Sequence, residues 1–459
     1  MSESPTNAQK WSTVSFWGAI IILLGLTGFQ VSSHLYLYGD GSHFLLSILS
    51  DKEFFQPVDS RFFANILKQF LPVLLIKSGI TDIKWISIAF GLNQYLVPMV
   101  GVILSYFILP KKDKAWIVFA LASYLLNLHH NNLYISTESF ASAAIFWPLL
   151  YYIVFGTHSR KKIIWASIGI ILTSTMHEAS LFLQLVFAVA LAFKGKDLFS
   201  HNLWILISLS LAVIISLSIN YYWILHPQDY MIVQHKEDFI SGIIQLKTFL
   251  YVRLSLPLAA LLIAQTFFKF TGKLRITLFV AIGVFIALII EQTLKGDQMF
   301  YPILHWEHRG LIILTPAFLG LALILFWKFR YQSETEFALP RYSLILATLV
   351  FTIYQVRITT LWNDFTSDLT SQISSSRGIL DYDKTSIASN QVKDQFAYTW
   401  SVPSLGLALH CQNSDEVNAL WRVPDSIWQP WRPSNRGDWP NLSYYGVEYR
   451  LFGPNKYLD

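Results

Sequence analysis

The residues that could do chemistry lie in polar segments that separate long apolar stretches of the chain. They combine carboxylates, imidazoles and guanidinium groups. This combination suits transfer from an activated phosphate ester, because a carboxylate can take the acceptor's proton while cations stabilise the departing phosphate. Histidine and carboxylate groups could also hold a divalent metal ion, such as Mg²⁺ or Mn²⁺, for the same purpose. The candidates are Asp40, His43, Asp59, Arg61, His129, His130, Glu138, His177, Glu178, Glu307, His308 and Arg309.

Several of these candidates also have an ordinary structural explanation. Asp40 could cap or end the loop that follows the first apolar segment. His129 and His130 could lie at a membrane interface, and as neighbours they cannot both face one point on a helix. Arg309 could form an ion pair with the glutamate two residues before it. Glu178, between two apolar segments, has few such uses, so we expect it to be functional.

The composition predicts a protein embedded in lipid. Of the 459 residues, 53% are hydrophobic and only 14% are charged, which is too little polar surface to solvate a globule of this size. The net charge of +5 is modest, and we expect no nucleic-acid partner. Cys411 is the only cysteine, which excludes an intramolecular disulfide and cysteine-based metal sites.

Basic clusters alternate with the polar segments, and this alternation indicates the topology. A membrane span needs about 20 apolar residues, and Lys and Arg accumulate in cytoplasmic loops. Every basic cluster falls on one side if the chain crosses the bilayer about 11 times. We therefore predict an all-α polytopic membrane protein with a cytoplasmic N-terminus and its polar segments on the opposite face. The expected spans are 15–35, 83–109, 115–128, 139–156, 163–176, 179–193, 203–225, 249–268, 276–290, 310–327 and 342–358.

Two of the expected spans are too short to cross the whole bilayer. Segments 115–128 and 163–176 reach about 21 Å at ~1.5 Å per residue, against a hydrocarbon core of about 30 Å. The turns that follow them, at His129-His130 and His177-Glu178, should therefore lie below the outer surface, buried in protein or lining a water-filled cavity. Local thinning of the bilayer or tilting of the helices is the alternative.

The first outer loop, residues 36–81, contains an apolar segment at 62–77 with a polar strip of Asn65, Lys68 and Gln69. Such a pattern predicts a helix lying in the membrane interface, interrupted at its proline.

The composition changes near residue 360. The following residues are rich in Ser, Asp, Asn and Pro and contain no further span. We therefore predict a transmembrane domain at 1–360 and a small soluble extracytoplasmic region at 361–459.

The predicted architecture resembles the GT-C superfamily of polytopic membrane glycosyltransferases. Four features carry the resemblance: an early acidic residue in the first outer loop, an interfacial helix, short spans around an outward cavity and an extracytoplasmic C-terminal region. The resemblance is architectural and covers about residues 1–360. In that family, an acidic residue of the first outer loop is the catalytic base or belongs to a metal site. The resemblance gives this role to Asp40, with Asp59 as the alternative. The chain departs from the commonest family pattern because no adjacent Asp-Glu or Asp-Asp pair follows the first span.

Further roles follow from the same resemblance. Arg61, Arg253 or Arg309 would hold the lipid-linked phosphate, and His177 and Glu178 would orient the donor or the acceptor. The sugar donor in this family is usually a polyprenyl-phosphate sugar or a lipid-linked diphosphate oligosaccharide.

The resemblance implies a multi-pass glycosyltransferase, expected in a bacterial inner membrane with its active site facing the periplasm. It would move a sugar from a polyprenyl-phosphate donor to a glycan, lipid or protein acceptor, with inversion at the sugar carbon. A polymerase or ligase of lipid-linked surface polysaccharide is one alternative, and a larger loop between late spans would favour it. A transporter is the other, and ionisable groups spread along a two-sided pathway would favour that function.

Overall fold

The computed structural model describes residues 7–130, 138–157, 159–226, 304–330, 343–390, 393, 396–397, 401–412, 419–422, 443–444 and 447–448. The described part is mostly helical. Its α-helices are α1 (Asn7–Ser32), α2 (Asp40–Asp51), α3 (Phe62–Lys77), α4 (Ile83–Ile108), α5 (Val118–His130), α6 (Glu138–Phe155), α7 (Arg160–Thr173), α8 (Leu181–His201), α9 (Leu203–Leu225), α13 (Leu304–Arg330), α14 (Ser343–Ser375) and α16 (Val402–His410).

Short elements connect and extend these helices. The 3₁₀ helices are η1 (Leu35–Leu37), η2 (Asp59–Arg61), η3 (Lys111–Ile117), η4 (Glu178–Ser180) and η5 (Tyr382–Lys384). Strands β1 (Gly378–Asp381) and β2 (Ala419–Arg422) pair in parallel, with Gly378 opposite Ala419. Strands β3 (Ser443–Tyr444) and β4 (Val447–Glu448) pair antiparallel.

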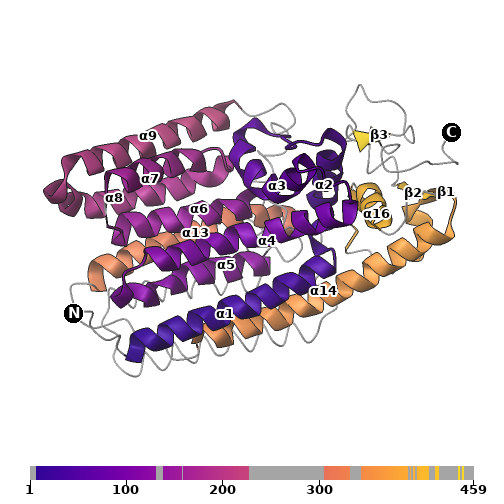
Figure 1. Ribbon diagram of the computed structural model, residues 1–459, viewed down its shortest axis with the longest axis horizontal. Coiled ribbons are helices and arrows are strands. Elements are labelled where there is room, and N and C mark those ends of the chain that lie inside the picture. The colour runs from indigo at the N-terminus through magenta and orange to yellow at the C-terminus, as the bar shows by residue number, and fades with distance from the viewer. Residues whose placement is uncertain are drawn as a thin grey trace.

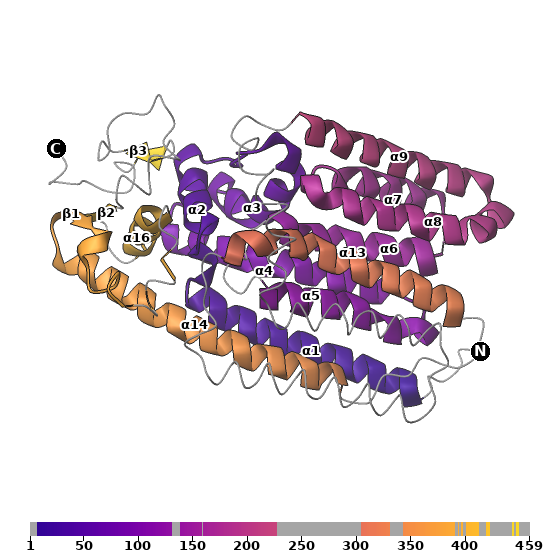
Figure 2. The same ribbon diagram turned by 180° about the vertical axis from the view of Figure 1, so that it is seen from behind.

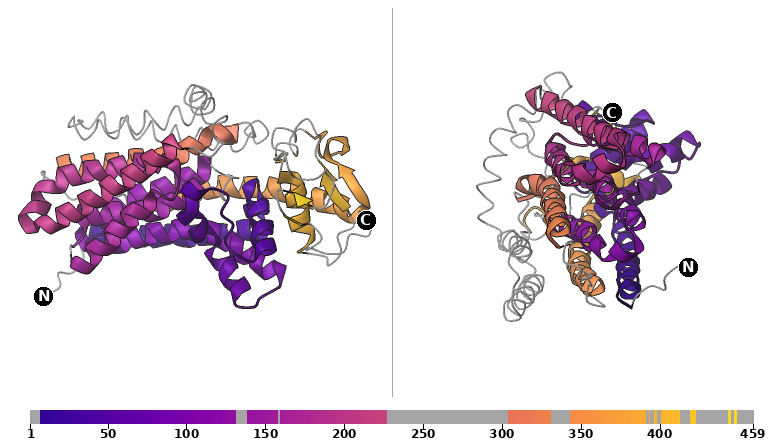
Figure 3. Two further views of the ribbon diagram at one scale, coloured as in Figure 1. Left: turned by 90° about the horizontal axis from the view of Figure 1, so that it is seen from above. Right: turned by 90° about the vertical axis from the view of Figure 1, so that its left-hand side faces the viewer.

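The long helices form a bundle with different structures at its two ends. Helices α1, α4–α9, α13 and α14 run alongside one another along the long axis of the molecule (Figure 1). Helices α2, α3 and α16 and strands β1 and β2 gather at one end, as the reverse view also shows (Figure 2). From above, α2 and α3 project from the bundle and the C-terminal elements continue beyond it (Figure 3). We call the end that carries α2 and α3 the loop end.

Six helical segments in the described part of the chain are long and apolar enough to cross a membrane. They are Ser12–Ser32, Ile83–Ile108, Glu138–Phe155, Glu178–Phe199, Leu203–Leu225 and Leu344–Ser375, with a shorter apolar helix at Ile313–Lys328. Large apolar side chains on their outer faces, including Phe107, Trp204 and Ile353, are exposed. Such contiguous apolar surface is consistent with a membrane protein. The expected spans 249–268 and 276–290 lie outside the described residues.

The two expected short helices are short in the structure. Helix α5 has 13 residues and α7 has 14, so each reaches about 20 Å at ~1.5 Å per residue. Helix α7 is therefore well below the length of a full bilayer crossing, whereas α5 continues without a break from the seven residues of η3.

Two basic clusters, at 111–114 and 194–196, adjoin the end of the bundle opposite the loop end. The Lys114 ammonium lies 4.1 Å from the centre of the Tyr106 ring, and the Tyr106 hydroxyl donates to Thr13 of α1 over 2.8 Å. Lys194 in the second half of α8 lies 4.5 Å from the centre of the Trp327 ring of α13. The first turns of α1 lie at the same end (Figure 1). In the described part of the chain, the clusters at 111–114 and 194–196 therefore share one end of the bundle.

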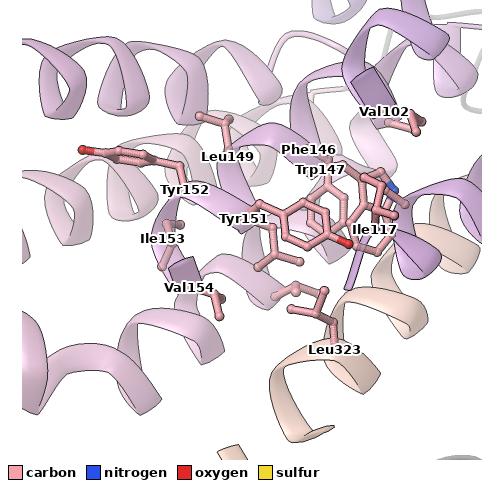
Figure 4. Close-up of a cluster of buried hydrophobic side chains, with 14 of the residues drawn as sticks. Val102, Ile117, Phe146, Trp147, Leu149, Tyr151, Tyr152, Ile153, Val154 and Leu323 are labelled. Atoms are coloured by element: carbon pink, nitrogen blue, oxygen red, sulfur yellow. The ribbon is translucent and has the colours of Figure 1, made fainter. Parts of the chain in front are cut away.

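The bundle is held together by a large apolar core centred on α6. Trp147 and Tyr151 are buried there beside side chains of α4, η3 and α13 (Figure 4). Helices α4 and α6 approach closely at Gly101, where a Cβ atom would lie 2.3 Å from the carbonyl oxygen of Ala144. The tight contact fixes the position of α6, whose first residue is Glu138.

A second apolar core joins the first loop to the C-terminal elements. Tyr38 packs edge-on against Trp362 of α14, with ring centres 5.7 Å apart, and the Trp362 indole donates to the Ser33 carbonyl over 2.9 Å. Helix α14 therefore continues to Ser375, well beyond the expected span end at residue 358. The expected domain boundary at 360 falls inside this helix, because apolar residues such as Phe365 and Leu369 continue its buried face.

Candidate functional site

A run of hydroxyl side chains ends α7. The hydroxyls of Thr173, Ser174 and Thr175 donate to backbone carbonyls three residues earlier, over 2.6, 2.6 and 3.0 Å. Such local bonds compete with continuation of the helix. The chain therefore leaves α7 at Thr173 and enters the turn that the sequence predicts at His177-Glu178.

Side chains cap both halves of this turn. His177 has an extended backbone and precedes η4, and its Nδ1 accepts the Ala179 N–H over 3.1 Å. Asn220 of α9 donates from Nδ2 to the carbonyls of Ser174, His177 and Glu178, at 3.2, 3.3 and 3.4 Å. The cap groups satisfy polar backbone that would otherwise be costly to bury.

The start of α3 docks on the same turn. The Phe63 N–H donates to the Thr175 carbonyl over 3.0 Å. Just beyond it, Ala64 is buried against Met176 of the turn and Ala141 of α6. Three segments far apart in sequence therefore meet at the loop end of the bundle.

Where these segments meet, Arg61, Glu138 and Glu178 form a buried cluster with the polar side chains of Ser60 and His177, which we call the ion cluster. Arg61 Nη2 lies 3.2 Å from Glu178 Oε2, and Arg61 Nε donates to both oxygens of the same carboxylate at 3.3 Å. Arg61 Nη1 lies 3.5 Å from Glu138 Oε2. The Ser60 hydroxyl donates to Glu178 Oε1. The side chains of Arg61, Glu138 and Glu178 are only 11%, 6% and 16% exposed.

The ion cluster contains more carboxylate than permanent cation. Arg61 is shared by Glu138 and Glu178. His177 Nδ1 accepts the Ala179 N–H and therefore carries no proton in this geometry. It also lies 3.3 Å from Glu178 Oε2, so a proton on Nδ1 would replace the cap by an ion pair.

The polar strip of α3 faces the protein. Asn65, Lys68 and Gln69 are buried, and α4 anchors this face because Gln94 donates to the Lys68 carbonyl over 2.8 Å. The Gln69 amide exchanges two hydrogen bonds with the Phe55 backbone, at 2.7 and 2.8 Å. Arg61 precedes this strip on the same side of the helix.

The outer face of α3 is apolar. Phe62, Phe70 and Leu74 are about half exposed. The expected helix at 62–77 is confirmed, but the expected interruption at proline is wrong, because α3 continues through Pro72. Ten residues into the helix, Pro72 removes one N–H donor, and packing of the buried face keeps the helix intact.

The candidates in the first loop lie at three different places. Asp40 begins α2 directly after Gly39, whose φ of 57° and ψ of −125° favour glycine. His43 is buried on the same helix, and its ring meets Phe55 edge-on at 5.2 Å. Asp59 is exposed, one residue before the ion cluster begins. Of the candidates Asp40, His43, Asp59 and Arg61 in this loop, Arg61 is the one that the structure brings to Glu138 and Glu178.

The remaining candidates are only partly described. Arg253 lies outside the described residues. His129 and His130 end α5, but the description does not extend to their side chains. Glu307, His308 and Arg309 were expected in a loop at 291–309, and that expectation is wrong for residues 304–309. These residues belong to α13, which begins at Leu304. Pro302 precedes this helix start, and no glycine or proline interrupts 304–309. Their side chains also lie outside the description.

Two residues that contact the ion cluster or its turn were not predicted from the sequence. Ser60 was not distinguished from other loop serines. Asn220 is an amide within an otherwise apolar span, and that feature alone could have identified it. In the described part of the chain, no three His, Cys, Asp or Glu side chains come together as a set of metal ligands.

Comparisons of the chain with protein-family models, curated proteins and solved structures give no match.

Proposed function

We propose that this protein is a membrane glycosyltransferase that moves a sugar from a polyprenyl-phosphate-linked donor to an acceptor. The active site would lie at the loop end, on the face opposite the basic clusters, which is the periplasmic face in a bacterial inner membrane. The observation that carries the proposal is the buried ion cluster, in which Arg61 holds two carboxylates. Intramembrane ionisable groups are expensive and usually functional.

The proposed reaction is a direct displacement. An acceptor hydroxyl oxygen attacks the anomeric carbon, the bond from that carbon to the phosphate oxygen breaks, and the electron pair leaves with the polyprenyl phosphate. The acceptor's proton passes to a carboxylate, and the sugar carbon is inverted. Glu178 supplies such a carboxylate in the ion cluster, and Asp40 is the second candidate, which the GT-C resemblance favours.

Arg61 has a different role in this proposal from a phosphate ligand. Its guanidinium is already engaged by Glu138 and Glu178, so it holds the carboxylates in place. Binding of the donor phosphate is then assigned to the other two candidate arginines, Arg253 and Arg309.

The position of the charged groups favours an enzyme over a transporter. The ionisable side chains of the ion cluster gather at one end of the bundle, whereas a transport pathway would need polar groups toward both faces. The apolar core around Trp147 and Tyr151 fills the bundle between the ion cluster and the basic end in the described part of the chain.

The test is incubation of the purified full chain in lipid nanodiscs with polyprenyl-phosphate hexoses and pentoses. Consumption of donor and release of polyprenyl phosphate are measured for the parent, Asp40→Asn, Glu178→Gln and Glu138→Gln. We expect Glu178→Gln to lose about 10²–10⁴-fold in rate if its carboxylate takes the proton. Glu53→Gln is the matched control, because Glu53 belongs to an exposed ion pair of the same loop.

The outcomes separate the activity from the site. A parent that neither binds nor consumes any such donor would refute the glycosyltransferase proposal. An active parent whose three carboxylate variants all keep the parental rate would mean that the ion cluster and Asp40 are not the site.

A further inference from the structure

Asn220 is a buried amide among the apolar helices of the bundle. It lies near the end of α9, and its side chain is fully buried. Burying an amide is unfavourable unless its hydrogen-bonding groups find partners. Its position therefore requires an explanation in terms of what it binds.

Both ends of the Asn220 amide are engaged. The nitrogen donates to the three carbonyls of the turn that carries Glu178, and the oxygen accepts a hydrogen bond from the amide of Gln184. Gln184 lies on α8, just after the turn, and is also fully buried. A donor on one side and an acceptor on the other is the property of an amide, and neither an apolar side chain nor a carboxylate supplies it.

One turn earlier on α9, Ser216 makes a similar contact with a different purpose. Its hydroxyl donates to the Ile170 carbonyl over 2.8 Å, inside helix α7. Ser216 therefore joins α9 to α7, whereas Asn220 joins α9 to the turn beyond α7. The two residues are matched in burial and differ in what they hold.

We propose that Asn220 is a positioning residue, which fixes the turn at residues 174–178 so that the Glu178 carboxylate meets Arg61 and the first loop docks on the bundle. As far as it concerns catalysis, this inference rests on the proposed glycosyl transfer. Its structural part stands without that activity, because the docking of α3 on the turn can be measured directly.

Disulfide trapping reports on that docking. Phe63 and Thr175 are joined by a backbone hydrogen bond, so their α-carbons are neighbours. Cysteines are placed at both positions in the full chain carrying Cys411→Ser, and the rate of disulfide formation with copper phenanthroline is followed. The rate is compared among the parent pair, Asn220→Leu and Ser216→Ala. Asn220→Leu keeps the branched arrangement of heavy atoms and suits an apolar helix, so the chain should still fold.

We expect Asn220→Leu to slow disulfide formation about tenfold, because a buried turn loses its hydrogen-bond donor, and Ser216→Ala to leave the rate within about twofold. An equal rate in Asn220→Leu and in the parent pair would overturn the inference. Equal slowing by Ser216→Ala would also overturn it, since the effect would then belong to helix packing in general.

A second readout separates positioning from loss of fold. If the parent transfers sugar, Asn220→Leu should lower kcat with little change in KM, and Ser216→Ala should change neither. A parent that transfers no sugar would refute the proposed function, and the disulfide rates would still decide the role of Asn220.

Discussion

The ion pair between Arg61 and Glu178 offers a sharp test of the buried cluster, because the same loop contains an exposed pair of nearly the same length. Arg61 and Glu178 approach to 3.2 Å with side chains 11% and 16% exposed. Lys77 and Glu53 approach to 3.1 Å with side chains 55% and 70% exposed. The two pairs differ mainly in burial, so their energies should differ for that reason.

The expected magnitudes follow from the distances and the burial. At an effective dielectric constant of about 20, unit charges separated as in the buried pair attract by a gross ~5 kcal/mol, part of which offsets desolvation. Removing one partner from a buried pair costs about 3–5 kcal/mol, because the other charge remains buried. We therefore expect Arg61→Met to destabilise the protein by about that amount, since it leaves two carboxylates without their shared cation.

A double-mutant cycle measures the coupling. Arg61→Met, Glu178→Gln and the double variant are unfolded with SDS in mixed micelles, and the free energy of unfolding is compared with that of the parent. We expect a coupling of about 1–3 kcal/mol for this pair. The same cycle with Lys77→Met and Glu53→Gln should give about 0–1 kcal/mol. A coupling between Arg61 and Glu178 no larger than that of the exposed pair would refute the description of a buried ion cluster.

Three further predictions concern the first loop and the C-terminal elements. Gly91→Ala should destabilise the protein by about 1–3 kcal/mol, because the added Cβ would lie 2.4 Å from the Tyr36 ring. Gly25→Ala, which has open space around the added Cβ, should not destabilise it. Thermal unfolding compares the two variants, and equal effects would contradict the packing argument. Burial lowers the pKa of His34 below its ordinary value of 6.5, so the unfolded chain binds more protons and the free energy of unfolding should fall as the pH drops below that value. His34→Asn should flatten the dependence of this free energy on pH between about pH 7.5 and 5. An unchanged pH dependence would count against the prediction. Burial raises the pKa of the Cys411 thiol to about 12, so maleimide should label it slowly in the folded protein near pH 8 and completely in SDS. Fast labelling without SDS would contradict the prediction, because it would show that the thiol is accessible.

Much of the architecture could be predicted from local sequence. The apolar segments, the shortness of α5 and α7, and the turn at His177-Glu178 follow from residue type and spacing, which act within a few helical turns. The last expected span ends at residue 358, but its helix α14 continues to Ser375. A polar composition after residue 360 did not stop α14, because Trp362, Phe365 and Leu369 pack against the first loop and make that part of the helix favourable.

The direction in which α3 faces could not be read from its sequence. Its polar strip is compatible with a helix that turns those groups to water, and equally with one that turns them to the protein. In the structure Lys68 and Gln69 face inward and Phe70 faces outward. Only the presence of α4, whose Asn93 and Gln94 bind the backbone of this helix, decides between the two.

The sequence by itself determined that polar residues end short apolar helices on the side away from the basic clusters, since hydrophobicity and charge are properties of each segment alone. The tertiary structure decided which of these residues meet. Arg61 and Glu178 are separated by 117 positions, and Glu138 comes from a third segment. Their contact depends on the docking of α3 and on Asn220 of α9. Such contacts are fixed by the packing of whole helices, so the spacing of residues in the sequence does not predict them.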